Sequence, residues 1–85
     1  MDIRPLTVPG SFVVTPKIHG DDRGEFVEWF RADLLKQATG LDFSVAQANL
    51  SVSAKGTLRG IHFADVPPGQ AKYVMCSSGS IEDFV

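Results

Sequence analysis

The chain has 85 residues, of which 44% are hydrophobic, and its eight basic and ten acidic side chains give a net charge of −2. This composition is typical of a globular protein, and it provides neither the basic field that holds nucleic acid nor the run of about 20 apolar residues that spans a bilayer. The N-terminus carries an acidic residue at position 2 and does not resemble a signal peptide. Cys76 is the only cysteine, so no intrachain disulfide can form. We therefore expect a cytoplasmic protein that binds neither nucleic acid nor membranes.

The N-terminal part of the chain predicts a β-hairpin. Residues 12–18 are rich in β-branched and aromatic side chains, although Pro16 suggests an edge position. A cluster of turn residues at 20–24 separates this stretch from a second β-like run at 25–30. The two runs are expected to pair with each other across that turn.

Residues 31–39 form the one helical candidate. Leu34, Leu35 and Ala38 cluster on one face at helical spacing. Gly40 follows directly and is suited to cap the C-terminus of a helix. The sequence therefore predicts a single short helix.

After the helix, the pattern switches to alternation of apolar and polar residues. Turn residues at 55–56, 64–69 and 77–80 separate the alternating stretches. The expected strands cover residues 46–52, 57–63, 71–76 and 81–85. Many short strands with regular turns favour a sandwich or barrel. Because the last run reads as a strand that is cut short, we expect residues 1–85 to be the N-terminal part of one domain, truncated at its C-terminus. The alternative is a complete miniprotein that ends in an edge strand.

The residues most able to carry chemistry lie on two of these runs. Arg59 and His62 belong to the run at 57–63, and Lys72 to the run at 71–76. A histidine can act as a base near neutral pH, a lysine can neutralise an oxyanion, and an arginine can grip phosphate. A single histidine on a strand is more often structural, however, and charged side chains such as those of Arg59 and Lys72 are more often solvated on the surface. Strict alternation also places Arg59 and His62 on opposite faces, unless Gly60 marks a bulge that realigns them.

Several stretches, in order and with fitting spacing, resemble the dTDP-4-dehydrorhamnose 3,5-epimerase family. They are Asp22-Arg23-Gly24-Glu25-Phe26, Glu28, Gln47-Ala48-Asn49-Leu50-Ser51, Gly56-Thr57-Leu58-Arg59-Gly60-Ile61-His62-Phe63, Pro67 with Gln70-Ala71-Lys72, and Gly79-Ser80-Ile81-Glu82-Asp83. The resemblance covers nearly the whole chain but only about the first half of a family member. It implies an all-β, cupin-type jelly roll, that is, an antiparallel double-sheet barrel, with one short helix.

The resemblance also implies an activity and its residues. The enzyme would epimerise a dTDP-4-keto-6-deoxy sugar at C3, C5 or both, through an enolate and without a cofactor. His62 matches the family's base and Lys72 the residue near the ketone oxygen. The positions that match substrate contacts are Arg23, Glu28, Gln47, Asn49 and Arg59. Family members are homodimers whose early hairpin reaches the neighbouring site, and the acid and the carboxylate that orients the histidine are expected beyond Val85.

Alternative functions stay open at this point. A C3-only epimerase or a sugar-nucleotide ketoisomerase would use the same fold, and so would a non-catalytic sugar-binding jelly roll. The polar residues Gln47 and Asn49 suit either a solvated outer face or a barrel interior that holds a ligand. A metal-dependent cupin is disfavoured, because His62 is followed by Phe63 and Ala64 and the usual His-x-His pair is missing. We therefore expect no catalytic metal.

Overall fold

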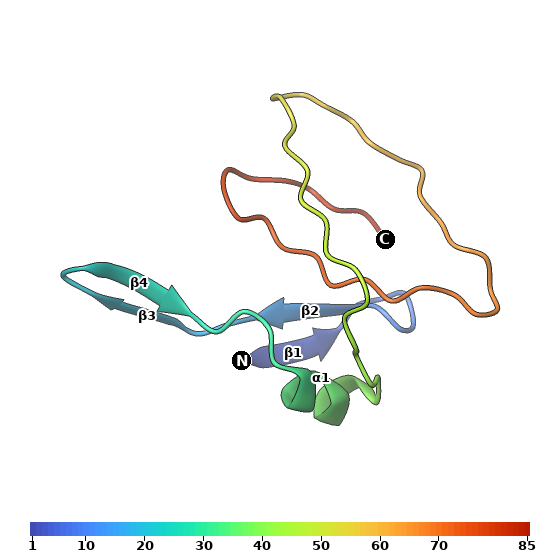
Figure 1. Cartoon of the computed structure of the whole chain (residues 1–85), viewed down its shortest axis with the longest axis horizontal. Coiled ribbons are helices and arrows are strands. Elements are labelled where there is room, and N and C mark those ends of the chain that lie inside the picture. Colours follow the sequence, from blue (N-terminus) through green and yellow to red (C-terminus); the bar gives the residue numbers. More distant parts are fainter. The chain divides into compact units, whose positions relative to one another are not determined.

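The computed structural model describes residues 1–85, and the chain divides into two units (Figure 1). The first unit comprises Met1–Ser44 together with Asp83–Val85, and the second comprises Val45–Glu82. All four strands and the one helix belong to the first unit.

The first hairpin pairs the N-terminal residues with the first predicted strand. β1 (Asp2–Pro5) runs antiparallel to β2 (Phe12–Thr15), with Ile3 opposite Val14. Of the predicted pairing between residues 12–18 and 25–30, Ile18 does lie opposite Val27, but residues 12–15 pair with β1 instead. The physical reason is that β1 supplies a nearer partner, since only a short loop separates the two strands and the loop needs little closure entropy.

The second hairpin forms around the predicted turn. β3 (Ile18–Asp21) pairs antiparallel with β4 (Gly24–Val27), and Asp21 lies opposite Gly24. Pro16 lies between β2 and β3, where its missing N–H would interrupt a continuous ladder. The turn prediction is thus confirmed, and the strand before it begins at Ile18 instead of Phe12.

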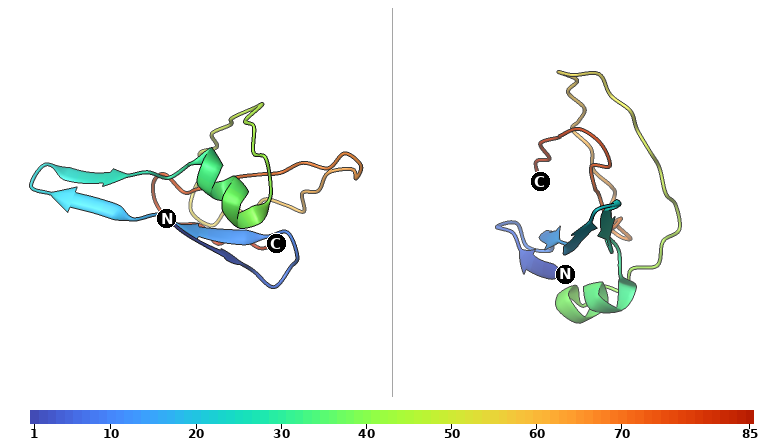
Figure 2. Two further views of the ribbon diagram at one scale, coloured as in Figure 1. Left: turned by 90° about the horizontal axis from the view of Figure 1, so that it is seen from below. Right: turned by 90° about the vertical axis from the view of Figure 1, so that its left-hand side faces the viewer.

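The predicted helix is confirmed as α1 (Ala32–Thr39), within one residue of its expected start. Gly40 ends it in the left-handed conformation at φ 76°, and its N–H donates to the carbonyl of Lys36 at 2.8 Å. Leu35 is the one buried side chain of the chain, 5% exposed. The helix lies against β1 (Figure 2), so its apolar face and the first hairpin share a small core.

The second unit contains turns but no strand or helix. Its two backbone hydrogen bonds close turns: Thr57 donates to Ala54 at 3.2 Å, and Gly69 donates to Asp65 at 2.8 Å. The turns predicted at 55–56 and 64–69 are therefore confirmed. The strands predicted at 46–52, 57–63, 71–76 and 81–85 are not found. An alternating segment becomes a strand only when a second strand completes its hydrogen-bond ladder, and no segment of this chain does so.

These elements confirm part of the predicted fold class. The chain has antiparallel β structure and one short helix, arranged as two separate two-stranded sheets. A closed double-sheet barrel is not formed by these strands, and the jelly roll stays a prediction. No helix is long and apolar enough to cross a membrane.

Candidate active site

The second unit carries five of the seven predicted site residues. They are all exposed: Gln47, Asn49, Arg59, His62 and Lys72. No hydrogen bond or ion pair joins any two of them, and the imidazole of His62 and the ammonium of Lys72 have no side-chain partner. The structure thus groups these residues in one unit without fixing their side chains against each other.

Arg59 is folded back onto the turn that precedes it. Its Nε donates to Oγ of Ser53 at 3.0 Å, across the turn at 55–56. Gly60 follows at φ 139°, a conformation that residues with side chains rarely adopt. The bulge expected at Gly60 is not found, because residues 57–63 form no strand. A bulge requires a paired strand, so the realignment of Arg59 and His62 stays a prediction.

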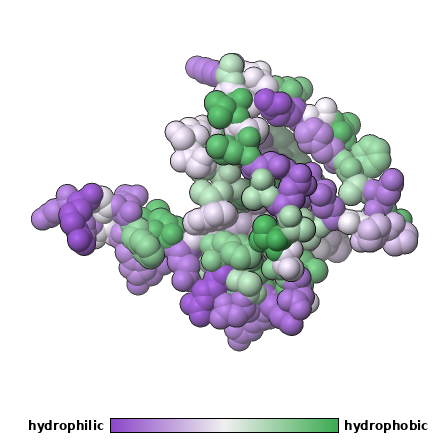
Figure 3. Space-filling view, in the orientation of Figure 1, coloured by the Kyte–Doolittle hydropathy of each residue, from purple (hydrophilic) through white to green (hydrophobic).

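The other two predicted residues lie in the first unit, with Arg23 in the turn between β3 and β4. Its side chain is 90% exposed. Its backbone N–H donates to Oδ1 of Asp21 at 2.8 Å, and its Nε lies 3.3 and 3.2 Å from the two carboxylate oxygens of Asp21. Its Nη2 pairs with Oδ2 of the same carboxylate. Figure 3 shows the tip of this hairpin as a hydrophilic surface.

A shallow hollow of about 280 Å³ lies beside Arg23. All of its lining residues belong to the hairpin: His19, Asp21, Arg23, Gly24, Glu25 and Phe26. The ring of Phe26 is 70% exposed, although an aromatic side chain is normally buried. The hairpin therefore presents charged groups and an uncovered aromatic ring on the same short element.

Glu28 lies just beyond β4 and takes part in a small ion-pair group. Its Oε1 is 3.5 Å from Nη1 of Arg31. Arg31 directs its Nε and Nη2 to the two oxygens of Asp33, at 2.9 and 3.0 Å. One oxygen of Glu28 thus lies beside a guanidinium that is paired more closely with a second carboxylate.

These ion pairs shift the titration of the carboxylates. The side-chain and then the backbone hydrogen bonds from Arg23 lower the pKa of Asp21 below its ordinary value. The side-chain hydrogen bond from Arg31 likewise lowers the pKa of Asp33. A carboxyl whose pKa is lowered by folding stabilises the fold above its ordinary pKa and loses that contribution as the pH falls through the lowered value. Both carboxyl groups are therefore ionised at neutral pH. Burial raises the pKa of the Tyr73 phenol.

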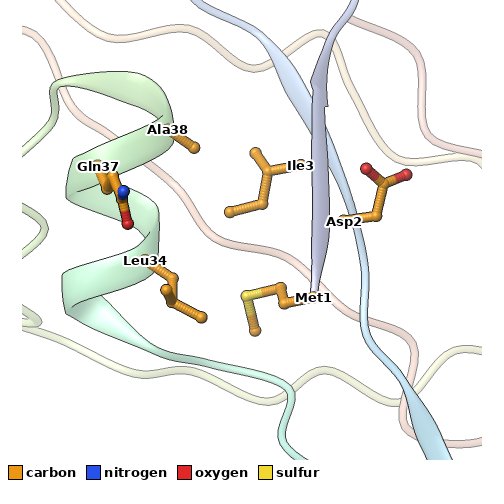
Figure 4. Close-up of a pocket in the computed structure, with 6 residues that line it drawn as sticks. All are labelled: Met1, Asp2, Ile3, Leu34, Gln37 and Ala38. Carbon is orange, nitrogen blue, oxygen red and sulfur yellow. The ribbon is translucent and has the colours of Figure 1, made fainter.

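A second hollow, between β1 and α1, contains none of the predicted site residues. Figure 4 shows Met1 and Ile3 pointing toward the helix and Asp2 pointing away from it. Leu34 and Ala38 face them from α1. These apolar groups can pack but have no acid–base chemistry, so we regard the hollow as part of the small core.

Side chains that commonly bind metal ions are dispersed. No group of three or more His, Cys, Asp or Glu side chains gathers in the chain. The two histidines, His19 and His62, belong to different units. That the protein works without a catalytic metal stays a prediction from the sequence.

Asp21 and Arg31, the partners of two predicted site residues, were not predicted. The signal for Asp21 is present in the sequence. In a turn, the side chain of an aspartate commonly accepts the backbone N–H of the residue two positions later, which here is Arg23. Arg31 carries no comparable signal. It contacts Glu28 within the link between the end of β4 and the start of α1.

The profile of one protein family, described as dTDP-4-dehydrorhamnose 3,5-epimerase, matches residues 5–85. The chain belongs to this family. The predicted resemblance is therefore confirmed over nearly the whole length of the chain.

Curated relatives carry related names. A dTDP-4-dehydrorhamnose 3-epimerase from Streptomyces niveus is 51% identical over the whole chain, which spans 41% of that protein. A dTDP-4-dehydrorhamnose 3,5-epimerase from Mycobacterium tuberculosis is also 51% identical over the whole chain, which spans 42% of it. A dTDP-4-dehydro-6-deoxyglucose 3-epimerase from Streptomyces bikiniensis is 49% identical over 98% of the chain. The chain thus spans about two fifths of the length of the curated relatives that it matches.

A solved structure shares the fold. The rmlC epimerase of Mycobacterium tuberculosis is 47% identical and superposes with a TM-score of 0.75. The superposition covers 80% of this chain and 34% of that one. At this identity, the superposed part of this chain shares its fold with the corresponding part of that structure.

Proposed function

We propose that the chain is part of an enzyme that epimerises a dTDP-4-keto-6-deoxy sugar at C3, at C5 or at both. The single observation that supports this most strongly is the family match over residues 5–85, which contains every predicted site residue. The names of the curated relatives agree with an isomerase of this kind. No redox cofactor is needed, because epimerisation beside a ketone moves protons and leaves the oxidation state unchanged.

In the proposed reaction, His62 removes the proton from a carbon next to the C4 ketone. The C–H bond breaks, its electron pair forms the enolate, and the imidazole becomes an imidazolium. A histidine suits this step because its ordinary pKa lies near neutrality, whereas an ordinary carboxylate is a weaker base and an ordinary lysine is already protonated. The exposed imidazole of His62 has no hydrogen-bonding partner, so its nitrogens are available to a substrate.

Lys72 is proposed to stabilise the enolate oxygen. Negative charge develops on the ketone oxygen as the proton leaves, and a positioned ammonium lowers the energy of that state. The side chain of Lys72 forms no ion pair that would compete for this charge. An acid on the opposite face of the sugar then reprotonates the carbon, and the configuration inverts. We assign that acid to no residue of this chain.

The remaining predicted residues are proposed to bind the substrate. Arg23 and Arg59 suit the diphosphate, because a planar guanidinium pairs with phosphate oxygens at two points. Gln47, Asn49 and Glu28 offer amide and carboxylate groups, which can form hydrogen bonds with the hydroxyl groups of the sugar or the N–H group of the nucleotide base.

We also propose that residues 1–85 belong to a larger cupin-type jelly roll that forms a homodimer in the cytoplasm. Large apolar side chains of the second unit are uncovered, among them Val52, Leu58 and Ile61 at 88, 96 and 95% exposed. Folded soluble proteins rarely leave such residues uncovered in a row. Further strands of the family domain would cover them, and a second subunit would receive the β3–β4 hairpin with Arg23.

A C3-only epimerase is a second candidate, favoured by relatives that are named 3-epimerases. The two candidates differ in the number of carbons that exchange protons with solvent. In D₂O, a 3-epimerase incorporates deuterium at C3 alone, whereas a 3,5-epimerase incorporates it at both positions.

The proposed base is tested by His62→Asn in the full-length protein. Asparagine keeps much of the size and polarity of histidine but cannot take the proton. General-base catalysis contributes about 10²–10⁴-fold, so deuterium incorporation should fall by that factor while dTDP binding is retained. The matched control is His19→Asn, which removes the other imidazole of the chain and should exchange normally. Exchange at the parental rate in His62→Asn would show that His62 is structural.

A further inference from the structure

We infer that Asp21 is a positioning residue that holds the guanidinium of Arg23 by one edge and leaves the opposite edge free for the substrate diphosphate. This inference rests on the proposed role of Arg23 in substrate binding. Asp21 is not among the residues predicted to contact the substrate.

The contacts of Arg23 divide its donors into two sets. A guanidinium has five N–H groups. Nε, at 3.3 and 3.2 Å from the two oxygens of Asp21, and Nη2, which pairs with Oδ2, form the edge that faces the carboxylate. Both N–H groups of Nη1 and the second N–H of Nη2 lie on the other edge. These three donors include a parallel pair, which is the arrangement that phosphate accepts at two points.

The backbone makes this arrangement more persistent than an isolated surface ion pair. Exposed ion pairs are worth little by themselves, because two long side chains must be ordered in water. Here the carboxylate of Asp21 also accepts the backbone N–H of Arg23 at 2.8 Å. The backbone hydrogen bond of the turn therefore orients the carboxylate, and only the arginine side chain has to be ordered to form the ion pair.

The neighbouring carboxylates do not share this role. Asp22 lies between the two residues in the sequence, yet it forms no hydrogen bond or ion pair with Arg23. Glu25 lines the hollow beside the tip and also has no ion pair with Arg23. Asp21 and Asp22 thus place the same charge one residue apart, and only one of them orients the arginine.

The two possible effects of a carboxylate at this position have opposite signs. If Asp21 positions Arg23, its loss leaves a mobile guanidinium, and substrate binding weakens by the price of ordering one long side chain, about 2- to 10-fold. If Asp21 only repels or competes with the diphosphate, its loss strengthens binding. The direction of the change therefore separates positioning from simple electrostatics.

The experiment uses Asp21→Asn in the full-length protein, with Asp22→Asn as the matched control. Asparagine can still accept the backbone N–H of Arg23, so the turn is kept, but its NH₂ group opposes Nη2 and breaks the two-point contact. Binding of dTDP is followed by calorimetry, and KM and kcat by deuterium incorporation. We expect Asp21→Asn to raise Kd and KM by about 2- to 10-fold with kcat changed less than 2-fold, and Asp22→Asn to change neither.

A double-mutant cycle with Arg23→Ala identifies the route of the effect. Arg23→Ala should weaken binding by itself, and adding Asp21→Asn should weaken it no further. Equal effects of Asp21→Asn and Asp22→Asn, tighter binding in Asp21→Asn, or additive losses in the double variant would each overturn the inference while leaving the proposed function intact. Unchanged binding in Arg23→Ala would instead remove the substrate contact itself, and the role of Asp21 with it.

Discussion

Leu35→Ala tests whether the small core between α1 and the first hairpin contributes to the stability of the folded protein. Leu35 is 5% exposed, and it is the only side chain of the chain that is buried. Replacing a buried leucine by alanine removes about 2–5 kcal/mol of stability, and the loss is larger where a cavity remains. The side chains around this core, such as Ile3 and Leu34, are only half-buried, so the site can collapse or admit water. We therefore expect a loss near the lower limit, about 2 kcal/mol.

Leu34→Ala is the matched control, because it makes the same change at the next position of the same helix. Helix propensity changes equally in the two variants, so their difference reports burial alone. Leu34 is half-buried against the hollow between β1 and α1, and we expect it to lose about 1 kcal/mol. Urea unfolding of the full-length variants measures both values. Equal losses, or a loss below about 0.5 kcal/mol for Leu35→Ala, would refute the assignment of the buried face of α1.

Three further predictions concern the activity and its conditions. Residues 1–85 alone should show no cooperative thermal transition and no turnover of a dTDP-4-keto sugar, because the second unit has no ladder; a sharp transition with normal turnover would contradict this. The full-length protein should keep its activity in excess chelator, and loss of activity that a divalent ion restores would show a metal-dependent enzyme. Arg59→Lys should mainly raise Kd for the nucleotide, since an ammonium cannot pair with phosphate at two points; unchanged Kd with slower proton exchange would assign Arg59 to the chemistry instead.

Local signals in the sequence predicted the local structure well. Gly40 ends α1 as predicted, and the clusters of turn residues at 20–24, 55–56 and 64–69 all form turns. Each of these features depends on the conformational preference of one or two residues, which the sequence states directly. Strand pairing was predicted less well, because the partner of a strand depends on which other β-prone segments lie within its reach. β2 pairs with β1 and not with the run at 25–30, although both runs are β-prone.

At the candidate site, too, the residues themselves could be predicted from the sequence better than their contacts. The family resemblance predicts which residues carry the chemistry, and the family match confirms the resemblance itself. The partners of Arg23 and Glu28 were not predicted, because they depend on the geometry of one turn and on the short link between β4 and α1. The roles of His62 and Lys72 stay predictions, since their side chains contact no group that would reveal a function.

His62 and Lys72 lie in the unit that has no secondary structure, and this bears on how the proposed site is assembled. Catalytic groups must be held to within about 0.5 Å of a productive geometry, which requires packing and hydrogen bonds around them. Ile61 and Phe63, on either side of His62, are 95 and 88% exposed, so nothing yet holds the imidazole. A ladder that pairs with residues 57–63 would bury the apolar neighbours and fix the orientation of His62 in the same step. In the proposed enzyme, covering this apolar face and preorganising the base are therefore one event, and the strands that complete the sheet contribute to catalysis without touching the substrate.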